Sequence, residues 1–104
     1  MMIARWTCEA KFGQKSEALG LLDEWNEQIG AQTDIDMSRT RTLTGSVGAK
    51  EAVILNEIEI SNLAELDAFF EKIASIEMHA EWGKSFGEVI VSGSTFWEVF
   101  RVVD

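Results

Sequence analysis

The spacing between apolar residues changes several times along the chain. The order of these changes limits the possible folds more than any other feature of the sequence. Residues 2–11 alternate between apolar and polar side chains, with Trp6 and Cys8 on the apolar face. A period of two is typical of a β-strand that is covered on one side. Over residues 14–32 the apolar spacing changes to three and four, which predicts an amphipathic helix. Gly30 lies near the end of this stretch, where we expect a C-terminal cap.

The middle of the chain returns to a period of two. Residues 35–43 alternate again, and residues 51–60 form a second strand-like run. Between them lie Gly45 and Gly48, and glycine takes the backbone conformations that tight turns require. We therefore predict a β-hairpin.

The last third predicts a helix with a break and then a strand. Asn62 is followed three residues later by Glu65, a pattern that resembles a capping box at a helix N-terminus. The helical spacing breaks near Ser75 and resumes over residues 77–86. Residues 94–103 then form the last predicted strand.

The resulting order is strand, helix, strand, strand, helix, strand. This order predicts an α+β fold, a ferredoxin-like βαββαβ sandwich in which the helices cover one face of a four-stranded antiparallel sheet. A chain of 104 residues is long enough for one domain but short for two, so we expect a single domain over residues 1–104.

Composition argues against several classes of partner. The net charge of −9 disfavours binding to nucleic acids, whose backbones are negative. Cys8 is the only cysteine, so no intrachain disulfide forms and a reducing compartment is expected. The N-terminus lacks the features of a signal peptide, and no apolar run approaches the roughly 20 residues of a membrane helix. We therefore expect a cytoplasmic protein that binds neither nucleic acid nor membrane.

Two strands are apolar on both faces, which predicts a partner. Residues 53–55 are all apolar, and residues 96–103 carry apolar side chains on both sides of the strand. Helices on one side of the sheet leave the other side uncovered. A second copy that packs sheet against sheet is the simplest cover, so we predict a homodimer. The alternative is a monomer whose last strand lies centrally beneath the helices.

The chain resembles the dimeric α+β barrel superfamily, and within it the NIPSNAP-like proteins most of all. The segments that carry the resemblance are residues 57–66, His79-Ala80-Glu81-Trp82 and residues 96–103. The superfamily also includes antibiotic-biosynthesis monooxygenases and haem-degrading monooxygenases. The resemblance implies a homodimer with a ligand-sized cleft between the sheet and the helices of each subunit. It does not imply one reaction, because this fold hosts many functions.

His79 is the only histidine and the one candidate catalytic residue. The resemblance to haem-degrading relatives implies that it could be an axial iron ligand, although the first strand lacks the asparagine that those relatives use. A single histidine does not make a zinc site, so no metal site is expected. The other possibilities are a general base, a hydrogen-bond donor or a histidine without a function.

Arg39 and Arg41 share one face of the second predicted strand. Guanidinium groups bind carboxylates and phosphates through paired donors, so both residues are candidate ligand-binding residues. The structural alternative is that Glu57 and Glu59 on the neighbouring strand neutralise them as cross-strand pairs.

Several aromatic side chains form either a pocket for a flat organic ligand or ordinary core. These residues are Trp6, Trp82, Phe86 and Trp97. Glu98 and Arg101 interrupt the apolar last strand, where we expect them to pair across the dimer or to line a cavity. Cys8 is interpreted as a small buried hydrophobic residue.

These observations favour a homodimer that binds a small apolar or aromatic ligand without a cofactor. The first alternative is a cofactor-independent monooxygenase that acts on a flat phenolic substrate. In that enzyme Trp82 and His79 would position the substrate, and Arg39 or Arg41 would hold an oxyanion. The second alternative is a haem-handling protein that uses His79.

Overall fold

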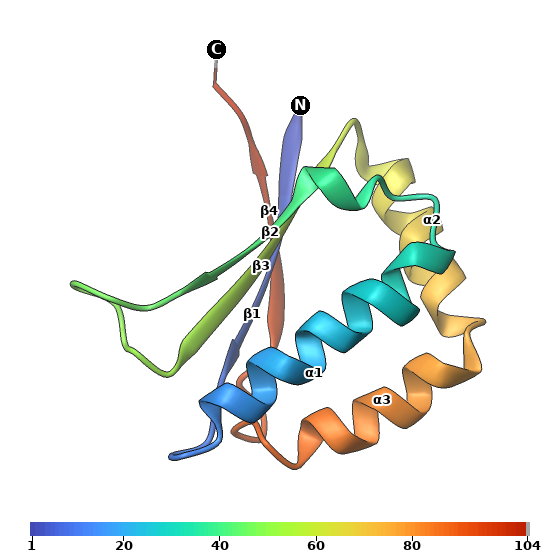
Figure 1. The fold of residues 1–104 in the computed structure, drawn as a ribbon. Coiled ribbons are helices and arrows are strands. Elements are labelled where there is room, and N and C mark those ends of the chain that lie inside the picture. Colours follow the sequence, from blue (N-terminus) through green and yellow to red (C-terminus); the bar gives the residue numbers. More distant parts are fainter. Residues whose placement is uncertain (104) are drawn as a thin grey trace.

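A four-stranded antiparallel sheet forms one layer of the molecule and the helices form the other (Figure 1). The computed structural model describes residues 1–103. In chain order the elements are β1 (Met2–Glu9), α1 (Lys15–Gln28), β2 (Thr40–Thr44), β3 (Val53–Ile60), α2 (Leu63–Ala74), α3 (Glu77–Gly87) and β4 (Phe96–Arg101). The strand order in the sheet is β2-β3-β1-β4. The predicted ferredoxin-like α+β fold is therefore confirmed. In residues 1–103 no helix has the length and apolar character needed to cross a bilayer.

Helix α1 lays the predicted apolar stripe on the sheet, but it ends earlier than expected. Ala18, Leu22 and Ile29 are buried. A 3₁₀ turn follows over Gly30–Gln32. Gly30 directly follows the C-cap residue Ile29, but it is not one of the glycines with positive φ and does not form the expected glycine cap. A Cβ atom on Gly30 would lie 2.8 Å from Cε of Met37, so glycine allows the Met37 side chain to pack closely here.

The strand predicted over residues 35–43 is wrong in its first half. The Asp36 carboxylate accepts hydrogen bonds from the backbone N–H of Ser38 (3.0 Å) and from its hydroxyl (2.7 Å). These bonds start a 3₁₀ turn over Met37–Arg39, and β2 begins only at Thr40. Short polar side chains that bond to the backbone compete with strand formation in this way.

The capping box and the break between the last two helices are confirmed. Oδ1 of Asn62 accepts from the Glu65 N–H at 2.9 Å, and the Glu65 carboxylate accepts from the Ser61 N–H at 2.9 Å. Helix α2 ends at Ala74 and α3 starts at Glu77. The two helices can therefore follow the sheet in different directions (Figure 1).

The side of the sheet that faces the helices buries two separate hydrophobic clusters. The first cluster contains Cys8 and Ile54, together with Leu22 and Phe86 from the helices. The second cluster contains Ala4 and Ile58, together with Ile35, Leu66 and Phe69. Since Cys8 pairs with Ile54 and Ala4 with Ile58 across the strands, the clusters lie one above the other along β1 and β3.

Candidate functional site

Polar side chains mark the boundary between the two hydrophobic clusters. On the sheet, the residue pair between the clusters is Trp6 and Asn56. On α1, Leu22 belongs to the first cluster and Trp25 packs against the second, which places Asn26 at the boundary. The side-chain oxygen of Asn26 is buried and has no hydrogen-bond partner within residues 1–103. Asn56 is half-buried, although it lies on an inner strand and on the side that the helices cover.

An unpaired buried amide oxygen is unfavourable for the folded state. Leaving such a group without a hydrogen bond costs about 1–3 kcal/mol. Buried polar atoms in folded proteins are nearly always paired with protein or with water, so an exception needs an explanation. The oxygen of Asn26 is therefore a candidate acceptor for a donor group of a bound molecule.

Aromatic rings lie on both sides of this boundary, since Trp6, Trp82 and Phe86 belong to the first cluster or pack against it and Trp25 packs against the second. Trp82 and Phe86 stack on α3 with ring centroids 4.6 Å apart, and Trp6 lies 5.5 Å from Phe86. Trp25 lies 6.3 Å from Trp82. Trp97 is the cross-strand partner of Trp6 on β4. The structure thus brings three of the predicted ligand-binding residues, Trp82, Phe86 and Trp97, to the helix-facing side of the sheet.

His79 is held in one tautomer by its neighbour on α1. The indole N–H of Trp25 donates a hydrogen bond to Nδ1 of His79 at 3.0 Å, and the imidazole lies nearly parallel to the Trp82 ring. Burial lowers the pKa of His79 below its ordinary value of 6.5, so the ring is neutral at pH 7. A neutral imidazole that accepts at Nδ1 carries its proton on Nε2. His79 can donate from Nε2, but it has no free lone pair with which to act as a general base.

The same geometry does not fit the haem alternative. An imidazole binds iron through a lone pair, and its other nitrogen then usually donates a hydrogen bond. In this protein the bond from Trp25 occupies Nδ1 and places the proton on Nε2. In residues 1–103 no group of three or more His, Cys, Asp or Glu side chains is arranged to hold a metal ion.

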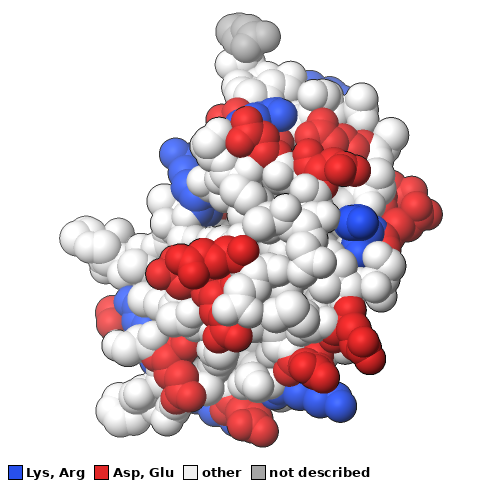
Figure 2. Space-filling view, turned by 45° about the vertical axis from the view of Figure 1, so that its right-hand side comes forward, with Lys and Arg blue, Asp and Glu red and all other residues white. Residues whose placement is uncertain are grey.

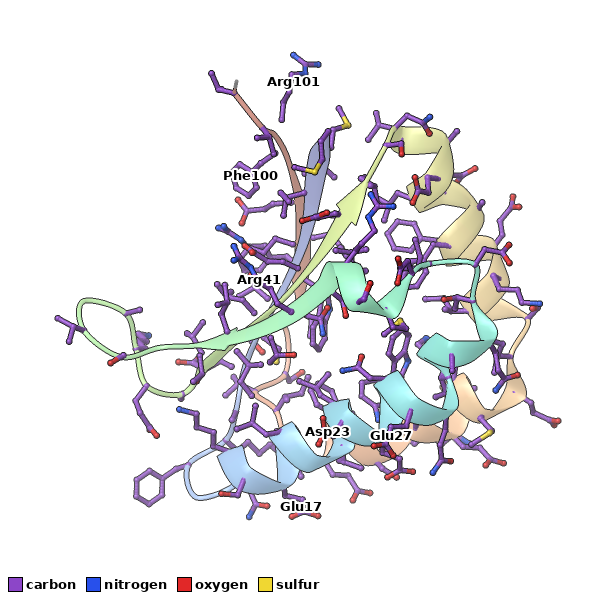
Figure 3. All side chains as sticks on the ribbon, turned by 45° about the horizontal axis from the view of Figure 1, so that its top comes forward. Glu17, Asp23, Glu27, Arg41, Phe100 and Arg101 are labelled. Atoms are coloured by element: carbon purple, nitrogen blue, oxygen red, sulfur yellow. The ribbon has the colours of Figure 1, made fainter. Side chains whose placement is uncertain are left out.

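Arg39 and Arg41 lie toward the opposite face of the sheet from Trp82 and His79, and Arg39 also lies 3.9 Å from Glu65 at the start of α2. Arg41 is the cross-strand partner of Glu57, Arg5 is the next residue along the same row, and Glu98 follows on β4. These four residues form a row of alternating charge across the face of the sheet that the helices do not cover, which we call the open face. Arg41 and Phe100 both lie on the open face (Figure 3). The sheet therefore separates the arginines from Trp82 and His79. They cannot hold an oxyanion on a substrate that those two residues position.

Glu57 is the centre of the charged row. Arg5 donates from Nε and Nη2 to one carboxylate oxygen at 2.8 Å, and Arg41 donates from Nε and Nη2 to the other at 2.7 Å. Burial is the largest influence on the Glu57 carboxyl and by itself raises its pKa. The hydrogen bonds from Arg41 and Arg5 outweigh it, and the pKa lies below its ordinary value. The predicted pairing of Arg41 with Glu57 is confirmed, and Arg39 lies 3.5 Å from Glu59.

The remaining candidates fall in different places. Glu98 and Arg101 lie on opposite faces of β4, since Glu98 pairs with Arg5 and Arg101 with Met2. Cys8 is buried, as interpreted from the sequence, and burial raises its pKa to about 11. Its thiol is therefore protonated at neutral pH and is not a nucleophile.

The sequence interpretation missed Asn26 and Asn56. Asn26 follows Leu22 by four residues, so it extends the apolar stripe of α1 with a polar side chain. Asn56 interrupts the alternating apolar residues Ile54 and Ile58 on the covered side of β3. A polar residue in an otherwise apolar position was the available signal in both cases.

Solved structures share this fold over the whole chain. A NIPSNAP family protein from Agrobacterium tumefaciens superimposes with a TM-score of 0.79 at 15% identity, covering 99% of this chain and 93% of that one. An uncharacterised NIPSNAP domain protein from Burkholderia xenovorans gives 0.76 at 12% identity, covering 99% and 95%. An antibiotic biosynthesis monooxygenase gives 0.71 at 12% identity, with 100% of both chains covered. No protein-family model and no curated protein matches the sequence. The predicted resemblance to NIPSNAP-like proteins is confirmed at the level of the fold.

Proposed function

We propose that this protein is a homodimer that packs sheet against sheet and binds a small aromatic or apolar molecule in each subunit. The ligand would bind at the boundary between the two hydrophobic clusters. The observation that carries this proposal is the buried side-chain oxygen of Asn26, which has no hydrogen-bond partner within residues 1–103. A ligand that donates an O–H or N–H group to this oxygen would remove the cost of leaving it unpaired.

The surrounding side chains indicate the chemistry of the ligand. Trp6 and Trp25 offer flat apolar surfaces, and binding sites for small molecules combine such surfaces with a few fixed polar groups. His79 can donate from Nε2 on the same side of the sheet, since its Nδ1 is occupied by Trp25. A flat molecule with one donor group and one acceptor group matches this set.

The open face supports the dimer. Phe96 and Phe100 are 50% and 42% exposed there, and these large rings are costly to leave in water. Charge supports the same arrangement. The three helices carry nine acidic side chains against three lysines, whereas the four strands carry four acidic side chains against three arginines. Acidic side chains likewise outnumber basic ones on the face that Figure 2 shows. Packing sheet on sheet therefore joins the nearly neutral layers and keeps the acidic helices apart.

Native mass spectrometry of the purified protein tests both parts of the proposal. The expected result is a dimer with twice the chain mass of 11.6 kDa that carries an additional small mass, which is lost under denaturing conditions. Asn26→Leu should remain a dimer and lose the additional mass. A monomer at micromolar concentration contradicts the dimer. An additional mass that is unchanged in Asn26→Leu contradicts the site.

A further inference from the structure

The charged row on the open face alternates in sign from one edge of the sheet to the other. In strand order it consists of Arg41 on β2, Glu57 on β3, Arg5 on β1 and Glu98 on β4. Such a row is complementary to a second copy of itself that runs in the opposite direction. We propose that Arg41 of each subunit forms an ion pair with the partner's Glu98. This inference rests on the proposed homodimer and adds which residues decide its orientation.

The middle of the row is satisfied within one chain, whereas its two ends are not. Glu57 accepts hydrogen bonds from Arg5 and from Nε of Arg41. The Arg41 side chain is nevertheless 70% exposed in the single chain, and its Nη1 is left for another acceptor. Glu98 is exposed and forms no ion pair with another side chain of residues 1–103. Because a covered charge without a partner is costly, a dimer that covers both ends must pair them.

Only one of two symmetric arrangements pairs these ends. Two sheets that pack face to face are related by a two-fold axis that lies between them. An axis parallel to the strands places β4 over the partner's β2 and β1 over the partner's β3, so every charge of the row faces an opposite charge. An axis along the row places each strand over its own copy, so that Arg41 faces Arg41 and Glu98 faces Glu98. Like charges that face each other across an interface are unfavourable, so the row selects the first axis.

The neighbouring row of the open face fits the same orientation. It lies two residues further along the strands and consists of Leu43, Leu55, Thr7 and Phe96. The axis parallel to the strands places Phe96 over the partner's Leu43, and these side chains are 50% and 37% exposed in the single chain. The axis along the charged row would instead place Leu55 opposite the partner's Glu59. Apolar packing and charge therefore favour one arrangement.

Glu98→Arg tests the pair, because it places two cations opposite each other at both ends of the row. It should raise the dissociation constant of the dimer at least tenfold in sedimentation velocity experiments. Adding Arg41→Gln removes this repulsion, and glutamine can still donate to Glu57, so the double variant should dimerise several-fold more tightly than Glu98→Arg alone. A merely structural role predicts the reverse. Arg101→Glu is the control, since this exposed arginine lies on the other face of β4 and should leave dimerisation unchanged.

A mixture of Arg41→Glu and Glu98→Arg chains gives a second test. Each variant alone sets like charges against each other, whereas the heterodimer restores opposite charges at both pairs. Native mass spectrometry should therefore detect the heterodimer in excess over a statistical mixture.

The outcomes separate this pair from the homodimer itself. A wild-type monomer overturns both. A wild-type dimer that Glu98→Arg does not weaken, or a double variant weaker than Glu98→Arg, overturns the pair and leaves the homodimer. Preferential assembly of Glu98→Arg chains with wild-type chains would place Glu98 opposite its own copy and overturn the orientation.

Discussion

At the scale of single residues, Asn26 and Glu57 show how burial gives polar groups opposite roles. Glu57 is 3% exposed, but its carboxylate accepts hydrogen bonds from two arginines, so it stabilises the open face. The oxygen of Asn26 is buried and has no partner among residues 1–103, so it weakens the fold of the free protein. The paired carboxylate of Glu57 is explained by structure alone. The unpaired oxygen of Asn26 is the kind of defect that binding sites retain.

Asn26→Leu should therefore stabilise the free protein. Leucine has a similar volume and removes the unpaired oxygen, so we expect the free energy of unfolding to rise by about 1 kcal/mol. Urea denaturation measures this change. Asn62→Ala is a useful comparison, because it removes the cap of α2 and should lower stability by about 1 kcal/mol. A loss of stability in Asn26→Leu would mean that the oxygen is paired in solution.

Glu57 should make the stability depend on acid pH. Its pKa in the folded protein lies below the ordinary value of 4.5, so the unfolded chain binds the proton more readily. The stabilisation is thus complete above about pH 4.5 and is lost as the pH falls through the lower folded pKa. Glu57→Gln should lose about 2 kcal/mol at pH 7 and show a shallower decline between pH 5 and pH 3 in denaturation experiments. Equal slopes would contradict this role for Glu57.

At the scale of elements, the turn between α1 and β2 is fixed by close packing. A side chain on Gly30 would require its neighbours to move, because a Cβ atom would lie 2.8 Å from Cε of Met37 and 3.1 Å from the Trp25 ring. Met37 reaches this position because the 3₁₀ turn that Asp36 starts directs it toward the second hydrophobic cluster. The turn thus joins the end of α1 to the beginning of the hairpin.

Two glycine substitutions in this region should have opposite effects. Gly30→Ala should lower the melting temperature, with a cost of about 1 kcal/mol, because Met37 must move. Gly20→Ala, inside α1 and facing open space, should raise stability by about 0.5–1 kcal/mol through helix propensity. Thermal denaturation of both variants checks the pair. If Gly30→Ala were neutral, the packing around Met37 would be looser than described.

Sequence patterns predicted the elements better than their boundaries. The spacing of Ala18, Leu22 and Ile29 identified α1, and the capping box identified the start of α2, because these signals are local. Alternation placed Met37 and Arg39 on one face, and this failed because the Ser38 N–H donates a hydrogen bond to the Asp36 carboxylate and a turn replaces the strand. The separation of Arg39 and Arg41 from Trp82 was also missed, since a strand pattern does not say which of its faces meets the helices.

At the scale of the whole molecule, the open face is the surface that the proposed homodimer buries. We expect Phe100→Asp to weaken the dimer by at least tenfold, because it places a charge in an apolar interface. Met78→Asp is the matched control, since Met78 on α3 is 41% exposed and Phe100 is 42% exposed. Sedimentation velocity measures both variants. Dissociation caused by Met78→Asp, with Phe100→Asp unaffected, would move the interface to the helices.

The separation of charge between the two layers also bears on how two copies meet in solution. With its negative charge gathered on the helices, each chain carries an electric dipole moment directed across the sheet. Two diffusing copies repel each other most when helices approach helices and least when sheets approach sheets. If the proposed dimer forms, the long-range field favours its sheet-to-sheet orientation before contact, and added salt weakens this preference as the Debye length shortens.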